Sequence, residues 1–222
     1  MRVLLFGGSG MIGQGVLREL LAREDVTQVL SVGRSPLEQT HARLENVLVK
    51  DLTDYAAVEA RFEGIDAVMY CLGVSSGGMS DAEYRRITYD FTLAAAHAVH
   101  RHSPNATFCF ISGASSDSTE QQGPMWARVK GAAENALQKV GFKAVYCFRP
   151  GYIQPMDGIV SKTPAYRWMY VFAAPLYPLF KGVTKYVTST RQLGFAMVQV
   201  GKDGFDKPFL ESVDINAVTA RQ

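Results

Sequence analysis

The residues with the clearest chemical meaning are the glycines of "FGGSGMIGQG". Gly7, Gly10 and Gly13 have the spacing G-x-x-G-x-x-G, and Gly8, Gly10 and Gly13 also fit G-x-G-x-x-G. They follow an apolar run and open an amphipathic segment, which is typical of a strand that turns into a helix. Such a turn presents backbone N–H groups and the positive end of a helix dipole to a diphosphate. The residues expected to bind a dinucleotide there are Gly7, Ser9, Gly10, Met11, Ile12 and Gly13.

The cation after the second apolar run distinguishes between two dinucleotides. An acidic side chain at this point would accept a hydrogen bond from the ribose 2′-hydroxyl of NAD, but the sequence is "SVGRS". Arg34, between the small Gly33 and Ser35, suits a 2′-phosphate through a planar, charge-assisted contact. We therefore expect NADP in preference to NAD, with Arg34 and Ser35 at the adenosine end of the site.

These residues need a scaffold of strands and helices. Apolar, β-rich runs recur at residues 3–6, 28–32, 47–49, 67–71, 107–111 and 144–148. Segments with helical period lie between most of them, at residues 12–23, 54–62, 81–102 and 125–140. Short buried strands that alternate with helices predict a parallel sheet with crossover connections. The expected fold class is α/β, a doubly wound parallel sheet of the Rossmann type with a small C-terminal substrate-binding portion.

Length and composition predict one domain. The chain has 222 residues, 47% hydrophobic and 20% charged, which is enough apolar material for one core. We expect a single domain over residues 1–222, in which 151–222 form the substrate-binding or partner-binding portion, because the alternation stops after Phe148. The net charge is +2 and the basic residues are scattered, which argues against nucleic acid as the main partner.

Cysteine and histidine spacing predicts no metal site. Cys71, Cys109 and Cys147 lie far apart and form no Cys-x-x-Cys pair, so buried reduced thiols are expected. Three histidines between residues 97 and 102 have no nearby carboxylate or thiol that would complete a metal site. No secretory leader fits the first residues, so we expect a cytoplasmic location.

Six motifs carry a family resemblance: "GGSGMIG", "KDLTD", "YCLGVSSGG", "FISGASS", "WARVKGAAE" and "FRPGYIQP". In this order they resemble the extended and atypical short-chain dehydrogenases/reductases, in the NAD(P)-binding, epimerase/dehydratase-like branch that includes the oxidoreductase-like Tat-interacting protein group. The resemblance covers roughly residues 1–155. It implies that further residues line the cofactor from its adenine to its nicotinamide. These are Asp51, Leu52, Cys71, Leu72, Gly73, Pro150, Gly151 and Ile153.

The resemblance also implies a catalytic trio. In this family a tyrosine transfers the proton, a lysine four residues later lowers the phenol pKa and holds the ribose, and a serine orients the substrate oxygen. Lys130 matches the lysine, but the tyrosine position holds Trp126, whose indole N–H is a donor only. Ser112 or Gly113 aligns with the serine, and Tyr152 is the first candidate for a substitute phenol. The further candidates are Tyr84 and Tyr89 for the phenol, and Ser115 and Ser116 for the hydroxyl.

Two functions therefore stay open. The first is an NADP-dependent oxidoreductase or epimerase-like enzyme that acts on a small apolar carbonyl or alcohol, with Lys130, Ser112 and Tyr152 as catalytic residues and Lys130 also on the cofactor. The second is a catalytically inactive NADP-binding regulatory or protein-interaction module, which Trp126 favours.

The stretch at residues 164–183 holds six aromatic residues and three prolines, and it is too interrupted to span a bilayer. Three interpretations stay open. It is a wall or lid for an apolar substrate, a homodimer interface, or a segment in weak contact with a membrane surface through Arg167, Lys181 and Lys185. The expected partner is accordingly a small-molecule substrate or a protein.

Overall fold

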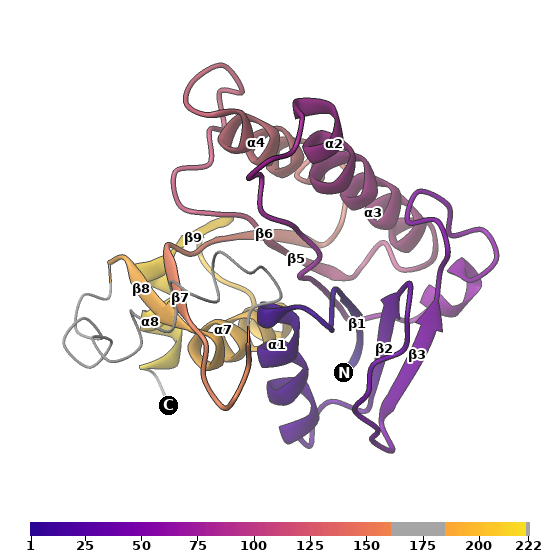
Figure 1. Ribbon diagram of the computed structural model, residues 1–222. Helices are drawn as coiled ribbons and strands as arrows, with labels where there is room; N and C mark the ends of the chain where they lie inside the picture. Colours follow the sequence, from indigo (N-terminus) through magenta and orange to yellow (C-terminus); the bar gives the residue numbers. More distant parts are fainter. Residues whose placement is uncertain (161–184, 221–222) are drawn as a thin grey trace.

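One parallel sheet organises the molecule (Figure 1). The computed structural model describes residues 1–160 and 185–220. The sheet has seven strands in the order β3-β2-β1-β4-β5-β6-β9, and every neighbouring pair is parallel. The strands are β1 (Arg2–Phe6), β2 (Gln28–Gly33), β3 (Leu44–Leu48), β4 (Ala67–Tyr70), β5 (Thr107–Ile111), β6 (Ala144–Arg149) and β9 (Phe209–Glu211). The predicted doubly wound α/β fold is thereby confirmed.

Helices cover both faces of this sheet (Figure 1). The helices on one face are α1 (Met11–Ala22), α7 (Thr190–Asp203) and α8 (Ser212–Thr219), and those on the other are η1 (Glu59–Phe62), α2 (Asp81–Arg85), η2 (Arg86–Asp90), α3 (Phe91–His102) and α4 (Met125–Leu137). A separate apolar cluster lies on each face. Because both faces are covered, the central strands β4 and β5 are buried along their whole length and show no polar alternation.

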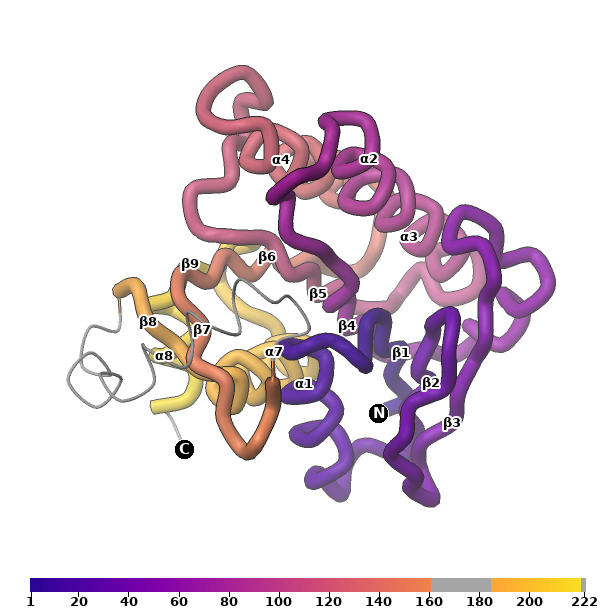
Figure 2. Tube along the Cα trace, viewed as in Figure 1, coloured from indigo at the N-terminus to yellow at the C-terminus, as the bar shows by residue number. Residues whose placement is uncertain are grey.

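Helices α1 and α7 meet backbone to backbone and lie side by side in Figure 2. A Cβ atom on Gly15 of α1 would lie 2.6 Å from the carbonyl oxygen of Thr190, and one on Gly194 of α7 would lie 2.8 Å from the carbonyl oxygen of Gly15. No side chain fits at either glycine without a backbone shift. Helix α7 therefore supports α1, the helix that opens after the glycine turn.

The structure differs from three of the predictions made from the sequence. Residues 54–62 form only the 3₁₀ turn η1 at their end, because the Asp54 carboxylate accepts the Ala56 N–H (2.9 Å) in a turn that competes with a helix. The helix predicted over 81–102 is divided by the π-helical turn η2. The alternation does not stop after Phe148, since α7 and β9 complete the sheet.

A second, two-stranded sheet follows β6. Its strands β7 (Tyr152–Gln154) and β8 (Val187–Ser189) are parallel. The aromatic stretch at 164–183 lies outside the described residues, so its three interpretations stay predictions. Within residues 1–160 and 185–220, no helix is long and apolar enough to cross a membrane.

Candidate functional site

The glycine turn has room for backbone only. Gly7 has φ +76°, and a Cβ atom there would lie 2.6 Å from the backbone nitrogen of Leu72. A Cβ atom on Gly13 would lie 2.1 Å from the carbonyl oxygen of Gly7, which accepts the Gly10 N–H at 2.9 Å. Gly10 is the N-cap of α1 and supplies no side-chain cap. The first-turn N–H groups of α1 therefore suit an anionic ligand such as a diphosphate.

The turn lies where the strand order reverses between β1 and β4. The close approach of Gly7 and Leu72 brings the segments after these two strands together, and such a switch point is the usual ligand crevice of doubly wound sheets. The half-buried Cys71 donates its backbone N–H to Phe6 O at 2.9 Å, and burial raises the pKa of its thiol. Cys71 can thus line the crevice as an unreactive neutral group, while Gly73 is exposed beside it.

Arg34 is exposed directly after β2. Its guanidinium has no ion-pair or hydrogen-bond partner in the described part of the chain, so its donors are available to a ligand, and the adjacent Ser35 is also exposed. Asp51 accepts the Thr53 N–H (2.9 Å) and hydroxyl (2.8 Å), which lower the pKa of its carboxyl. Leu52, the next residue, is buried.

Lys130 and Trp126 converge at the end of β5. A Cβ atom on Gly113 would lie 3.6 Å from the Trp126 ring and 3.8 Å from Lys130 Cδ, so both side chains project from α4 to one place. Lys130 Nζ donates to Ile111 O at 3.2 Å, and burial lowers the pKa of its ammonium to about 8. The Lys130 amine therefore gains and loses its proton near pH 8, and it lies beside the last residues of β5.

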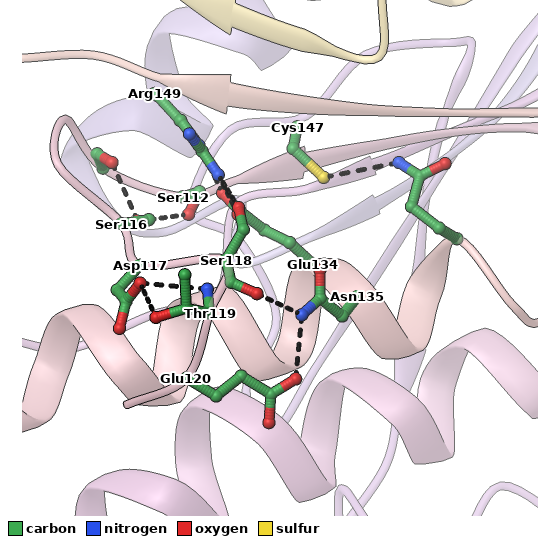
Figure 3. Close-up of polar contacts among 12 residues, drawn as sticks. Ser112, Ser116, Asp117, Ser118, Thr119, Glu120, Glu134, Asn135, Cys147 and Arg149 are labelled. Atoms are coloured by element: carbon green, nitrogen blue, oxygen red, sulfur yellow. Dashed lines mark hydrogen bonds and ion pairs between the residues drawn. The ribbon is translucent and has the colours of Figure 1, made fainter. Parts of the chain in front are cut away.

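Ser112 already uses its hydroxyl proton inside the turn that follows β5. Its Oγ lies 2.9 Å from Ser116 Oγ, and Ser116 donates to Gly113 O at 2.8 Å (Figure 3). Because Ser116 gives its proton to Gly113, the proton between the two serines belongs to Ser112. In this arrangement Ser112 can still accept a hydrogen bond from a ligand, but it must rotate to donate one.

The turn between β6 and β7 is held by its neighbours. Ala114 N–H donates to the carbonyl of the buried Pro150 (3.0 Å), and Gly151 N–H donates to Ser212 Oγ (2.9 Å). Tyr152 donates its hydroxyl to Gln154 Oε1 at 2.8 Å on β7. The structure thereby joins the segments after β5 and β6.

The other tyrosine candidates lie on α2 and η2. Tyr84 is buried, and Tyr89 lies beneath the Arg85 guanidinium at 4.2 Å from its ring centroid. Neither has a described contact with Lys130. Among the described residues no group of three His, Cys, Asp or Glu side chains is arranged to hold a metal ion.

One ionic pair beside this site was not predicted from the sequence. Glu134, fully buried on α4, accepts two hydrogen bonds from Arg149, the last residue of β6 (Figure 3). Both residues lie in motifs that carry the family resemblance, "KGAAE" and "FRPG". The available signal was the spacing of four between Lys130 and Glu134, which puts both on one face of a helix.

Comparisons with known proteins agree with this geometry. A family model for NAD(P)H-binding proteins matches residues 7–157. The Chaetomium globosum "Protein FMP52, mitochondrial" is 26% identical over 154 residues, which are 68% of this chain and 65% of that protein. "Protein HTATIP2" of Rattus norvegicus is 25% identical over 156 residues, 68% of this chain and 62% of that protein. The matched region spans less than two thirds of each relative.

Solved structures share the fold over almost the whole chain. A short chain dehydrogenase family protein from Francisella tularensis has a TM-score of 0.63 at 17% identity and covers 99% of this chain and 98% of its own. The Bordetella bronchiseptica enzyme WbmF, solved in complex with NAD+, has a TM-score of 0.65 at 14% identity and covers 99% and 77%. The chain therefore belongs to the NAD(P)H-binding family, with a site for a nicotinamide cofactor, and it shares its fold with a short chain dehydrogenase family protein.

Proposed function

We propose that this protein binds NADP and catalyses an oxidoreductase or epimerase-like reaction on a small apolar carbonyl or alcohol. The observation that carries the proposal is the convergence of Lys130 and Trp126 at Gly113, next to the Ser112 hydroxyl. The dinucleotide, when bound, supplies the hydride acceptor or donor. Lys130 holds the ribose, Ser112 faces the substrate oxygen, and residues 150–153 pass the nicotinamide.

Two features of the chain fit such a cofactor. The glycine turn leaves a backbone cradle that a Cβ atom on Gly7 or Gly13 would fill, and α1 begins there without a side-chain cap. The diphosphate would lie at this helix N-terminus, with Ser9, Met11 and Ile12 beside it. Arg34 is the proposed partner of the 2′-phosphate and the reason to prefer NADP over NAD.

The cofactor preference is tested by titrating NADPH and NADH into wild type and Arg34→Gln. We expect Arg34→Gln to weaken NADPH binding about tenfold, since a charge-assisted contact is lost, and to leave NADH binding unchanged. Lys143→Gln removes an exposed cation just before β6, a strand four places along the sheet from β2, and should change neither. Tighter binding of NADH than NADPH by wild type would contradict the preference.

The proton donor in this proposal is not Trp126, because its indole cannot exchange a proton near neutral pH. Tyr152 is the first candidate, and its hydroxyl would have to leave Gln154 to act. The test is NADPH oxidation over a panel of small carbonyls by wild type, Lys130→Ala and Tyr152→Phe. Turnover that survives Tyr152→Phe unchanged would exclude this donor.

A second candidate function is an inactive NADP-binding module that recruits a protein. It is favoured by the engaged Ser112 proton and by Trp126. Trp126→Tyr separates the two functions, because it restores a phenol one helical turn before Lys130. Turnover in Trp126→Tyr with none in wild type would favour the inactive module, whereas equal turnover would favour an enzyme with another acid.

Location and assembly are part of the same proposal. The free cysteines, two of them fully buried, suit a reducing compartment. We propose the cytoplasm, and the word mitochondrial in the relatives' names supplies the competing location. Cell fractionation decides between them.

We also propose that residues 151–222 bind a substrate or partner, form a homodimer or contact a membrane surface. Light scattering tests the homodimer, and liposome co-sedimentation tests the membrane contact.

A further inference from the structure

The buried carboxylate of Glu134 is fully paired. Arg149 Nε donates to Glu134 Oε1 at 2.9 Å and Arg149 Nη2 to Oε2 at 2.5 Å, so both oxygens are used (Figure 3). Glu134 has no exposed surface. A carboxylate in such a position is stable only when it is paired and hydrogen-bonded, which makes Arg149 its obligatory partner.

Arg149 has three further contacts. Its Nη2 donates to Ser118 Oγ at 2.7 Å, its Nη1 lies 3.6 Å from Glu211 Oε1, and its guanidinium lies 4.6 Å from the Phe209 ring centroid. These contacts join β6 to the loop after β5 and to β9. The guanidinium is therefore fixed from several sides and keeps its position beside α4.

The pair matters for the site because Lys130 and Glu134 are four residues apart on α4. Side chains with this spacing meet on one helix face, where a lysine and a glutamate form an ion pair. Here Arg149 occupies both carboxylate oxygens, and Lys130 Nζ instead donates to Ile111 O at the end of β5. Among the described residues, the charged or titratable groups that act on Lys130 are Glu134 on its own helix and the thiol of Cys147 on β6.

We propose that Arg149 is a positioning residue which, by holding Glu134, keeps Lys130 directed toward the end of β5. Removal of the Arg149 charge would leave a buried carboxylate one helical turn from Lys130, and the ammonium would turn to it. The consequence for the cofactor rests on the proposed function, because it assumes that Lys130 holds the ribose. The orientation itself concerns only residues of this chain and is measured without cofactor.

The test is competitive labelling of Lys130 by acetic anhydride at pH 8 in the full chain, quantified by mass spectrometry and normalised to the exposed Lys143. In Arg149→Met the rate of labelling should fall about tenfold, since an unpaired carboxylate nearby raises the pKa of the amine. In Arg149→Met/Glu134→Gln the rate should return to the wild-type value. The control Arg101→Met breaks a surface pair with Glu59 and should have no effect. An unchanged rate in Arg149→Met would overturn the proposal.

A second variant keeps the test decisive if Arg149→Met does not fold. Glu134→Gln leaves the Arg149 cation without its opposing charge, so the Lys130 amine should be labelled faster at pH 7 than in wild type. The same rate as wild type would overturn the proposal.

NADPH titration of the same variants separates this inference from the proposed function. We expect Arg149→Met to weaken binding about tenfold and the double variant to restore it. If labelling changes as expected but Lys130→Ala binds NADPH normally, then the ribose role of Lys130 fails and the positioning role of Arg149 stands.

Discussion

At the scale of single residues, a buried carboxylate and a half-buried ammonium lie one turn apart on α4. Glu134 is stabilised as a carboxylate by two hydrogen bonds from a guanidinium. Lys130 has one carbonyl acceptor and lies 5.5 Å from the Phe110 ring centroid, which compensates less for lost hydration. The structure thus stabilises the acidic group of the pair and leaves the basic group easy to discharge. An amine of this kind is suited to a role in which it gains or loses a proton near neutral pH.

This difference predicts a pH effect on stability. Burial lowers the pKa of Lys130 to about 8 from its ordinary 10.5, so between pH 8 and 10.5 the unfolded chain binds more protons than the folded chain. The contribution of Lys130 to the free energy of unfolding therefore rises with pH across this window, by about 3 kcal/mol. The buried thiols of Cys109 and Cys147 act in the opposite direction, because burial raises the pKa of each. Their contribution to the free energy of unfolding falls as the pH rises.

Because these effects oppose one another, the contribution of Lys130 is measured as the difference in unfolding free energy between wild type and a variant without the amine. Urea unfolding of wild type and Lys130→Met is followed from pH 7 to pH 10.5, and the advantage of Lys130→Met should shrink above pH 8. Two curves that stay parallel over the whole range would show that Lys130 keeps its ordinary pKa in the folded chain.

At the scale of elements, the turn from β1 into α1 tolerates no added atoms at two of its glycines. In Gly13→Ala the new Cβ atom would lie 2.1 Å from Gly7 O, so the start of α1 must move. Overpacking of this kind costs about 1–3 kcal/mol, and we expect NADPH affinity to fall at least about tenfold because the diphosphate site moves with the helix. The control is Gly77→Ala, where the added atom would meet only Ser75 Oγ at 3.5 Å. Calorimetric titration of both variants checks this, and unchanged affinity in Gly13→Ala would place the diphosphate elsewhere.

The strands and the longer helices could be predicted from the sequence, because buried parallel strands are continuous apolar runs, as in "TFCFI". The segment around Tyr55 and Phe62 could not. Their spacing of seven fits a helix, but Tyr55 enters the core from a loop and Phe62 from the 3₁₀ turn η1. In that loop Asp51 and Asp54 accept hydrogen bonds from backbone N–H groups, which compete with a helix. Strand β9 has only three residues and needs β6 to define it.

The candidate site was predictable in part for similar reasons. Glycine spacing follows from backbone geometry that is local, so Gly7 and Gly13 could be found in the sequence. The Arg149 pair with Glu134 depends on two elements that meet only in the fold. The hydrogen bond between Ser112 and Ser116 depends on the turn at Ser115, which has φ +66°, and a positive φ at a serine is rare enough to escape sequence reasoning.

At the scale of the whole molecule, the two ends of the sequence depend on the contact between α1 and α7. We expect Gly194→Ala to lower the free energy of unfolding by about 1–3 kcal/mol, since its Cβ atom would lie 2.8 Å from the carbonyl oxygen of Gly15. An alanine at an unconstrained glycine inside a helix would instead raise it by about 1 kcal/mol. The sign of the change in chemical denaturation therefore decides whether the two backbones are in contact.

The same contact has a consequence for synthesis on the ribosome. Residues 11–22 emerge early, but the helix that packs against their glycine face ends at Asp203. Until that point has left the exit tunnel, the nascent chain cannot complete the apolar cluster that contains Val16, Leu17 and Leu20. Since α7 supports α1, we expect the dinucleotide to bind only after this helix has been made, and a chain released earlier to present its uncovered apolar residues to chaperones and proteases.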